Sequence, residues 1–202
     1  MNPPFQCAIA HVGIYQNFGA YMAFYETAVE RLFDVLQSGA ETSDTLAMPI
    51  LALMRHSMEL GYKYSLWELH QMMDEKFDSQ KYGHHELPSL HKSLYDYFKR
   101  TVEHYRLPDH VMDGFEKYRL KTETAMQKFS ALDKLSFSFR YPIDKKSGGV
   151  NFGLHTTIDL SQMRQLYDEA MILLRHTADV VGEYVDIHRH MQAEMRQFQG
   201  VW

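Results

Sequence analysis

Cysteine is almost absent from this sequence of 202 residues, which contains Cys7 alone. A single cysteine excludes an internal disulfide and any metal cluster built from several thiolates. No apolar run reaches the roughly 20 residues that a membrane-spanning helix needs, and the first residues, MNPPFQ, lack the basic and then apolar pattern of a signal segment. We therefore expect a soluble, cytoplasmic protein without a membrane partner.

The sequence also has fewer positively charged than negatively charged residues. The chain has 21 Lys and Arg against 26 Asp and Glu, which gives a formal net charge of −5. This balance argues against broad electrostatic binding of nucleic acid. A local basic groove remains open, because the chain has 12 His and its Arg residues are clustered. The apolar content of 45% and the charged content of 23% are typical of a globular chain, and we expect one domain over residues 1–202.

The most informative stretch is LAMPILALMRHSMELGYKYSLWELHQMMD at 46–74. Its apolar residues recur at intervals of three and four in two rows, so apolar side chains cover most of the circumference of the predicted helix. A helix of this kind lies at the centre of a fold.

Four charged or titratable residues interrupt that apolar surface: Arg55, His56, Glu59 and Lys63. Their spacing of three and four residues places them on one face of the helix. Buried charges are costly unless they are paired and hydrogen-bonded. They form either a structural ion network or a site in which His56 titrates and Arg55 or Lys63 binds an anion. A metal site fits less well, because bundle sites favour the order Glu-x-x-His and the two cations would repel a metal ion.

Four more helices follow from apolar periodicity and from Pro and Gly positions. They are expected at 5–37, from about Pro88 to Pro108, from Pro108 to about Leu132, and from Asp159 to about Phe198. The last helix would be about 55 Å long, which exceeds a bundle of this size, so its far half is expected to pack on a second copy in a homodimer.

Two further segments contain candidate binding residues. His84 and His85 precede the third helix, where free N–H groups favour anions; the alternative is that one His caps the turn and the other faces water. The alternating pattern of LSFSFRYPI at 135–143 predicts a strand, and with the return of the chain a small β-hairpin over 135–158. Arg140 then points either into a polar cleft or to the surface beside Asp144.

Three of these motifs together resemble bacterial HEPN-like proteins. They are Arg-His-x-x-Glu-Leu-x-x-Lys at 55–63, the Gly-His-His-Glu-Leu segment at 83–87 and Phe-Arg-Tyr-Pro at 139–142. The resemblance implies an all-helical, commonly dimeric bundle from toxin, phage-defence or RNA-processing systems. It also implies, for active members, metal-independent ribonuclease activity with an Arg-x(4–6)-His motif.

This sequence departs from that nuclease motif, since no Arg is followed by His after four, five or six intervening residues. The nearest pairs are Arg100 with His104 and Arg106 with His110, each with three intervening residues. Both pairs share a helix face, but they also fit a solvated polar surface.

We therefore expect an all-α, HEPN-like antiparallel bundle of about five main helices with a small β-hairpin. The expected function is that of a non-catalytic module of bacterial defence or stress that binds a nucleotide, an RNA end or a protein partner. The alternative is a metal-independent ribonuclease with a displaced Arg/His site. No cofactor or metal is expected. The candidate residues are, for catalysis, His56, Arg55 and Glu59, and for binding, Lys63, His84, His85, Arg140 and Tyr141, with Arg100 and His104 as a further pair.

Overall fold

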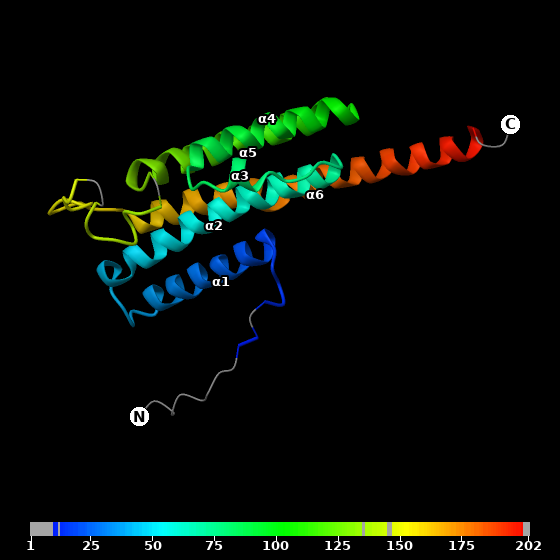
Figure 1. The fold of residues 1–202 in the computed structure, drawn as a ribbon. Coiled ribbons are helices and arrows are strands. Elements are labelled where there is room, and N and C mark those ends of the chain that lie inside the picture. Colours follow the sequence, from blue (N-terminus) through cyan, green and yellow to red (C-terminus); the bar gives the residue numbers. More distant parts are fainter. Residues whose placement is uncertain (1–9, 12, 135, 145–146, 200–202) are drawn as a thin grey trace.

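The computed structural model describes residues 10–11, 13–134, 136–144 and 147–199 of the chain, and within these residues the regular structure is helical (Figure 1). The helices are α1 (Phe18–Gln37), α2 (Ser43–Met72), α3 (Ser79–Tyr82), α4 (Leu87–Tyr105), α5 (Asp109–Leu132) and α6 (Leu160–Gln199). The all-α prediction is confirmed. The expected first helix begins later than predicted, at Phe18, and residues 5–9 lie outside the described part of the chain.

The long helix α2 lies at the centre, as its two apolar rows predict. It packs against α1 on one side and against α4 and α6 on the other, while α5 closes the bundle between α4 and α6 (Figure 1). Fifteen of its 30 residues are buried. An α-helix covered on most sides has little room for charge, so its polar residues need partners within the protein.

The bundle is only partly antiparallel, which corrects the expectation from the sequence. Tyr62 meets His91 and His70 stacks on Tyr97, so α2 and α4 run in the same direction. The reason is the connection at 73–86, which contains α3 and returns along α2 before α4 begins. This return brings His85 back to the middle of α2, next to Glu59.

Helix α6 also runs parallel to α2. Ser57 bonds Tyr167, Ser65 bonds the carbonyl of Leu174, and Arg189 reaches Asp74. Beyond that point α6 projects past the other helices (Figure 1). No helix in the described ranges combines the length and the apolar character that crossing a membrane requires.

The predicted β-hairpin is not confirmed in the described residues. Only one isolated antiparallel bridge, between Ile143 and Val150, is present there. The N–H of Tyr141 bonds the carbonyl of Phe137 at 3.0 Å, and these two rings stack at 4.5 Å. This is the spacing of a helical turn, in which residues four apart meet. The alternation of aromatic residues therefore predicted a strand, whereas the described segment forms a turn.

Candidate polar site on the central helix

Glu59 is the centre of a polar cluster formed by α2 and two loops. Its carboxylate is almost fully buried, and Oε1 accepts hydrogen bonds from Lys63 Nζ at 2.8 Å and from His85 Nδ1 at 2.9 Å. Lys63 lies one turn further along α2, whereas His85 comes from the loop that returns after α3. Burial by itself raises the pKa of Glu59, but the bonds from Lys63 and His85 outweigh it, so the pKa is below its ordinary value. The carboxylate is therefore ionised at neutral pH.

Arg55 joins α2 to two loops. Its side chain is fully buried, its Nε donates to the carbonyl of Asp133 at 2.8 Å, and Nη2 donates to the carbonyls of His85 at 2.8 Å and Lys134 at 3.2 Å. The guanidinium thus holds the loop before α4 and the loop after α5 against the middle of α2. This arrangement supports the structural interpretation of Arg55 over an anion clamp.

Two buried polar atoms in the cluster have no hydrogen-bond partner in the described residues. They are Arg55 Nη1 and Glu59 Oε2, which face each other at 3.7 Å. At this distance the two groups attract each other but do not form a hydrogen bond. A buried ion pair that is not fully hydrogen-bonded retains part of its desolvation cost. Arg55 Nη1 can therefore still donate a hydrogen bond, and Glu59 Oε2 can still accept one.

His85 is the exposed member of the cluster. Its side chain is 57% exposed, although the acceptor of its Nδ1 is buried. Because Glu59 is ionised and can only accept, Nδ1 of His85 donates the proton of this hydrogen bond. His84, the neighbouring residue, bonds the N–H of Glu86 and the hydroxyl of Ser89 through its two ring nitrogens. These bonds hold His84 within the turn that enters α4, and His85 faces outward from Glu59.

His56 lies beside the cluster on the α1 side. Its ring packs edge-on against Tyr25 of α1, with 4.5 Å between ring centroids. Burial lowers the pKa of His56, the negative charge of Glu59 opposes this, and the positive charges of Lys63, His85 and Arg140 lower the pKa further. His56 is thus neutral at pH 7 and half-buried.

Arg140 lies close enough to influence both Arg55 and His56 electrostatically. It is exposed, it bonds the carbonyl of Ser136, and its guanidinium lies 5.8 Å from the ring centre of Tyr141. Together, Arg55, Lys63 and Arg140 supply three fixed positive charges, against the two carboxylates of Glu59 and Asp133. On a chain of net charge −5, this local excess of positive charge favours an anion.

Arg100 and His104 lie elsewhere. Arg100 pairs with Glu75 and Tyr97 near the end of α2, and His104 packs against the ring of Tyr105. Since α4 runs parallel to α2, both residues lie beyond the level of His70, far along the bundle from Glu59. The structure brings together Arg55, Glu59, Lys63 and His85. His84, Tyr141 and the pair Arg100 and His104 make their contacts outside this group.

Sequence reasoning missed Asp133. This residue is 2% exposed, its carbonyl accepts from Arg55, and its Oδ1 accepts the N–H groups of Phe137 and Ser138. An Asp directly after a helix is common, and no hydrophobic periodicity in the sequence marks it as a partner of another helix. Only the fold shows that Arg55 bonds the carbonyl of Asp133. Within the described residues, no group of three or more His, Cys, Asp and Glu side chains is placed to hold a metal ion.

Comparison with known proteins adds no identification. No family model, curated protein or solved structure matches the chain. The function must therefore be inferred from the geometry described above.

Proposed function

We propose that this chain is a HEPN-like helical protein of bacterial defence or stress whose polar cluster binds a phosphate group of RNA or of a nucleotide without catalysis. The observation that carries this proposal is the exposed imidazole of His85, held by buried Glu59 beside Lys63. His85 and exposed Arg140 are the groups that a phosphate can reach from solvent. A carboxylate behind the His fixes its orientation, and the neighbouring cations attract the anion.

The test is binding of AMP and of a 5′-phosphorylated single-stranded RNA, measured by calorimetry. Removing an exposed ligand group leaves the fold intact, so His85→Ala and Arg140→Gln should each weaken binding at least about tenfold, within the range of a lost charge-assisted hydrogen bond. His104→Ala on α4 is the matched control and should bind as wild type does. Absence of binding to the wild-type protein, or equal binding by all variants, would overturn the proposal.

The alternative function, a metal-independent ribonuclease, is favoured by one specific contact. Glu59 and His85 form a carboxylate–imidazole pair in which the buried carboxylate orients the exposed ring. In RNA cleavage, Nε2 would take the proton of the 2′-hydroxyl as its oxygen attacks the adjacent phosphorus. The 5′-oxygen then leaves and takes a proton from water, which yields a 2′,3′-cyclic phosphate.

Cleavage of single-stranded RNA in the presence of EDTA distinguishes this alternative from simple binding. The ribonuclease interpretation requires cyclic-phosphate products that disappear in His85→Ala and persist in His104→Ala. Binding without products in the wild-type protein rejects catalysis and leaves the binding function in place.

We further propose that the protein is a homodimer formed through α6. The outward face of α6 carries an exposed apolar stripe made of Ile172, Val180, Ile187, Met191 and Met195. The first part of this stripe borders a groove of about 300 Å³ between α5 and α6, and the last part lies on the projecting end (Figure 1). A face that contains both an apolar groove and an apolar ridge is suited to self-association across a two-fold axis.

Helix register supports the choice of a second copy. If two α6 helices pair antiparallel about Tyr184, Met191 of one copy lies opposite Thr177 of the other, and Met195 lies opposite Leu173. Thr177 and Leu173 line the groove. The same register brings His190 near the other copy's Asp179, although within one chain these side chains pair with Glu194 and His176. The strip from 172 to 195 is about 36 Å long, and a standard interface buries ~800 Å² per partner.

A further inference from the structure

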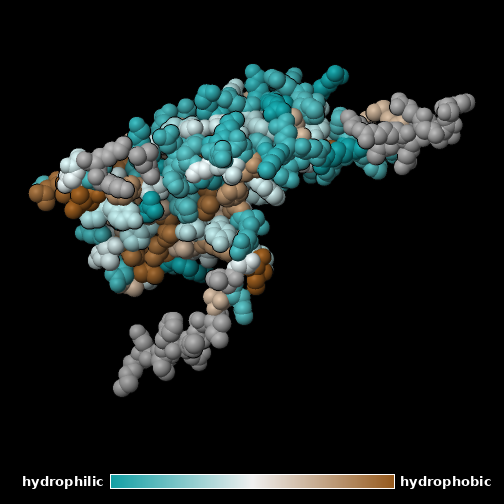
Figure 2. Space-filling model, viewed as in Figure 1, coloured by the Kyte–Doolittle hydropathy of each residue, from teal (hydrophilic) through white to brown (hydrophobic). Residues whose placement is uncertain are grey.

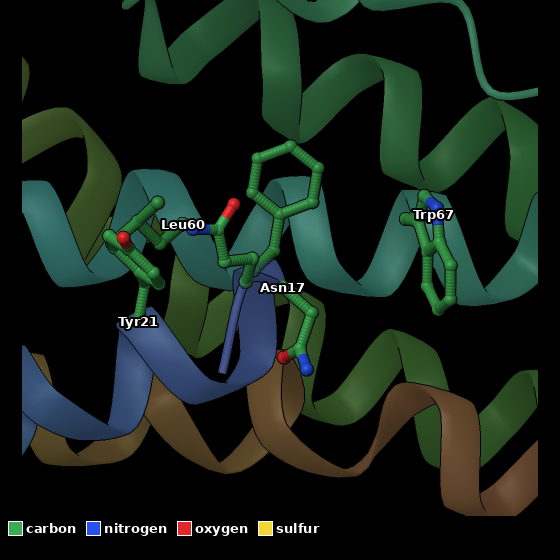
Figure 3. Close-up of a pocket in the computed structure, with 6 residues that line it drawn as sticks. Asn17, Tyr21, Leu60 and Trp67 are labelled. Atoms are coloured by element: carbon green, nitrogen blue, oxygen red, sulfur yellow. The ribbon is translucent and has the colours of Figure 1, made fainter. Parts of the chain in front are cut away.

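A cavity lies between α2 and the start of α1 (Figure 3). Its volume is about 360 Å³, and its walls are predominantly apolar. The lining residues are Gln16, Asn17, Phe18, Tyr21, Leu60 and Trp67. In Figure 3, Tyr21 and Leu60 stand on one side, Trp67 stands on the other, and Asn17 lies between them.

The lining of this cavity combines aromatic surface with the side-chain amides of Gln16 and Asn17. The three rings of Phe18, Tyr21 and Trp67 offer flat apolar surface on which another planar ring can stack. Asn17 Oδ1 accepts the N–H of Ala20 at 2.8 Å as the cap of α1. Its Nδ2 has no hydrogen-bond partner in the described chain and can donate to a ligand in the cavity. Such a lining fits a planar ring that carries hydrogen-bond acceptors at its edge.

The cavity and the polar cluster share one face of α2. His56, Leu60, Lys63 and Trp67 follow at intervals of four, three and four residues, which aligns them along this face. Leu60, in the cavity wall, directly follows Glu59, so the two side chains project about 100° apart around the helix. A ligand that spans both regions must therefore carry a ring and an anion joined by a linker.

Resting on the proposed phosphate-binding function, we propose that this cavity holds the base of a nucleotide whose phosphate lies at His85. The base stacks on Trp67 and Tyr21 and accepts a hydrogen bond from Asn17, and the ribose crosses the surface of α2 beside His56 and Lys63. Figure 2 shows a mostly hydrophilic surface over α4, with hydrophobic patches towards α1.

Trp67 fluorescence tests the inference directly. The chain has two Trp residues, so Trp202→Phe leaves Trp67 as the single reporter. In this background AMP should quench the fluorescence, whereas ribose 5-phosphate should bind more weakly and leave it unchanged. Tyr21→Ala should weaken AMP binding at least about fivefold, in the range of one lost base–aromatic stack, without affecting ribose 5-phosphate. Leu120→Ala, an exposed apolar residue on α5, is the control and should change neither.

The outcomes separate this inference from the function on which it rests. If AMP and ribose 5-phosphate bind equally and Trp67 fluorescence stays constant, the cavity does not take the base, and phosphate binding stands. If neither ligand binds, phosphate binding fails and the base pocket fails with it. If AMP quenches Trp67 but Tyr21→Ala binds AMP as the parent does, the stacking arrangement is overturned.

Discussion

At the scale of single residues, Glu59 is a buried carboxylate that neutralises positive charge, because it lies between Arg55, Lys63 and His85. Glu59→Gln would leave buried positive charge without a counter-ion. We expect the variant to lose about 3 kcal/mol or more of unfolding free energy at pH 7, as measured by urea denaturation. Glu103→Gln, which removes an exposed partner of Lys99, should change the stability by less than about 0.5 kcal/mol.

The effect of Glu59 should also depend on pH. Its pKa in the folded protein lies below the unfolded value of about 4.3. Its charge therefore stabilises the protein above about pH 4, and this contribution is lost as the pH falls through the folded pKa. The stability gap between wild type and Glu59→Gln should narrow in acid. A gap that is absent at pH 7, or constant down to pH 3, would contradict the role given to this carboxylate.

Arg55→Lys separates the structural role of Arg55 from a role in binding. Lysine keeps the charge but cannot serve three carbonyl groups in the planar geometry of guanidinium. We expect a loss of about 3 kcal/mol in thermal or urea unfolding. An unchanged midpoint together with lost AMP binding would show instead that Arg55 acts on the ligand.

His91 provides a second test of burial by pH. Burial lowers its pKa to about 4, its Nδ1 bonds the hydroxyl of Tyr62 at 3.0 Å, and its Nε2 has no partner in the described residues. The unfolded pKa is about 6.5, so the neutral ring contributes its full stability above that pH. As the pH falls from 6.5 to 4, about 3 kcal/mol should be lost.

The measurement for His91 is urea denaturation of wild type and His91→Gln between pH 7.5 and 4.5. The decline in stability should be shallower in His91→Gln, while His104→Gln, at an exposed position on α4, should follow wild type. Identical slopes in wild type and His91→Gln would show that His91 is charged in the folded protein.

Whether the position of a site residue could be predicted from the sequence depends on whether its partners lie in the same helix or in another element. The clustering of Arg55, Glu59 and Lys63 follows from helical spacing alone, because all three belong to one helix. The meeting of His85 with Glu59 depends on the return of the loop at 73–86, and that of Arg55 with Asp133 depends on where α5 ends. Contacts between elements leave no periodic trace in a sequence.

Among the helices, α2 and α6 approach each other closely at Gly61. A Cβ added at Gly61 would lie 2.9 Å from Cβ of Leu174, a side chain fixed within α6. We therefore expect Gly61→Ala to cost about 1–3 kcal/mol through overpacking. Gly114→Ala on α5, where an added Cβ meets nothing within 4 Å, should instead gain about 0.5–1 kcal/mol. Urea denaturation of both variants measures this, and a Gly61→Ala variant as stable as wild type would contradict the close approach.

The helices were predictable to different degrees. The centre and ends of α2, α4 and α5 follow from apolar periodicity, and α2 spans Ser43–Met72 where 46–74 was predicted. The direction of α4 relative to α2 was not predictable. The length of a connection does not show whether the next helix starts at the near end of the preceding helix, and runs antiparallel to it, or whether the connection first runs back along that helix, so that the next one is parallel. The strand predicted at 135–143 is not confirmed in the described residues, because alternate aromatic residues also fit a turn in which Phe137 and Tyr141 stack.

For the whole molecule, the exposed stripe on α6 leads to a prediction about mass. Light scattering at micromolar concentration should give a species of twice 23.8 kDa, because pairing buries the stripe. Met191→Glu should shift the protein to a monomer, whereas Leu154→Glu, in the loop before α6 and 94% exposed, should leave the dimer intact. A wild-type species of 23.8 kDa would show that α6 does not pair in this way.

The binding of phosphate at the Glu59–His85 cluster is tested most directly by the imidazole resonances of the 12 His residues during titration with AMP. We expect the signals of His85 and His56 to move together and to saturate, because the phosphate lies against one and close to the other. The signals of His104 and His110, on α4 and α5, should stay in place. A titration in which His85 does not move, or in which all exposed His residues move alike without saturation, would contradict a phosphate site at this cluster.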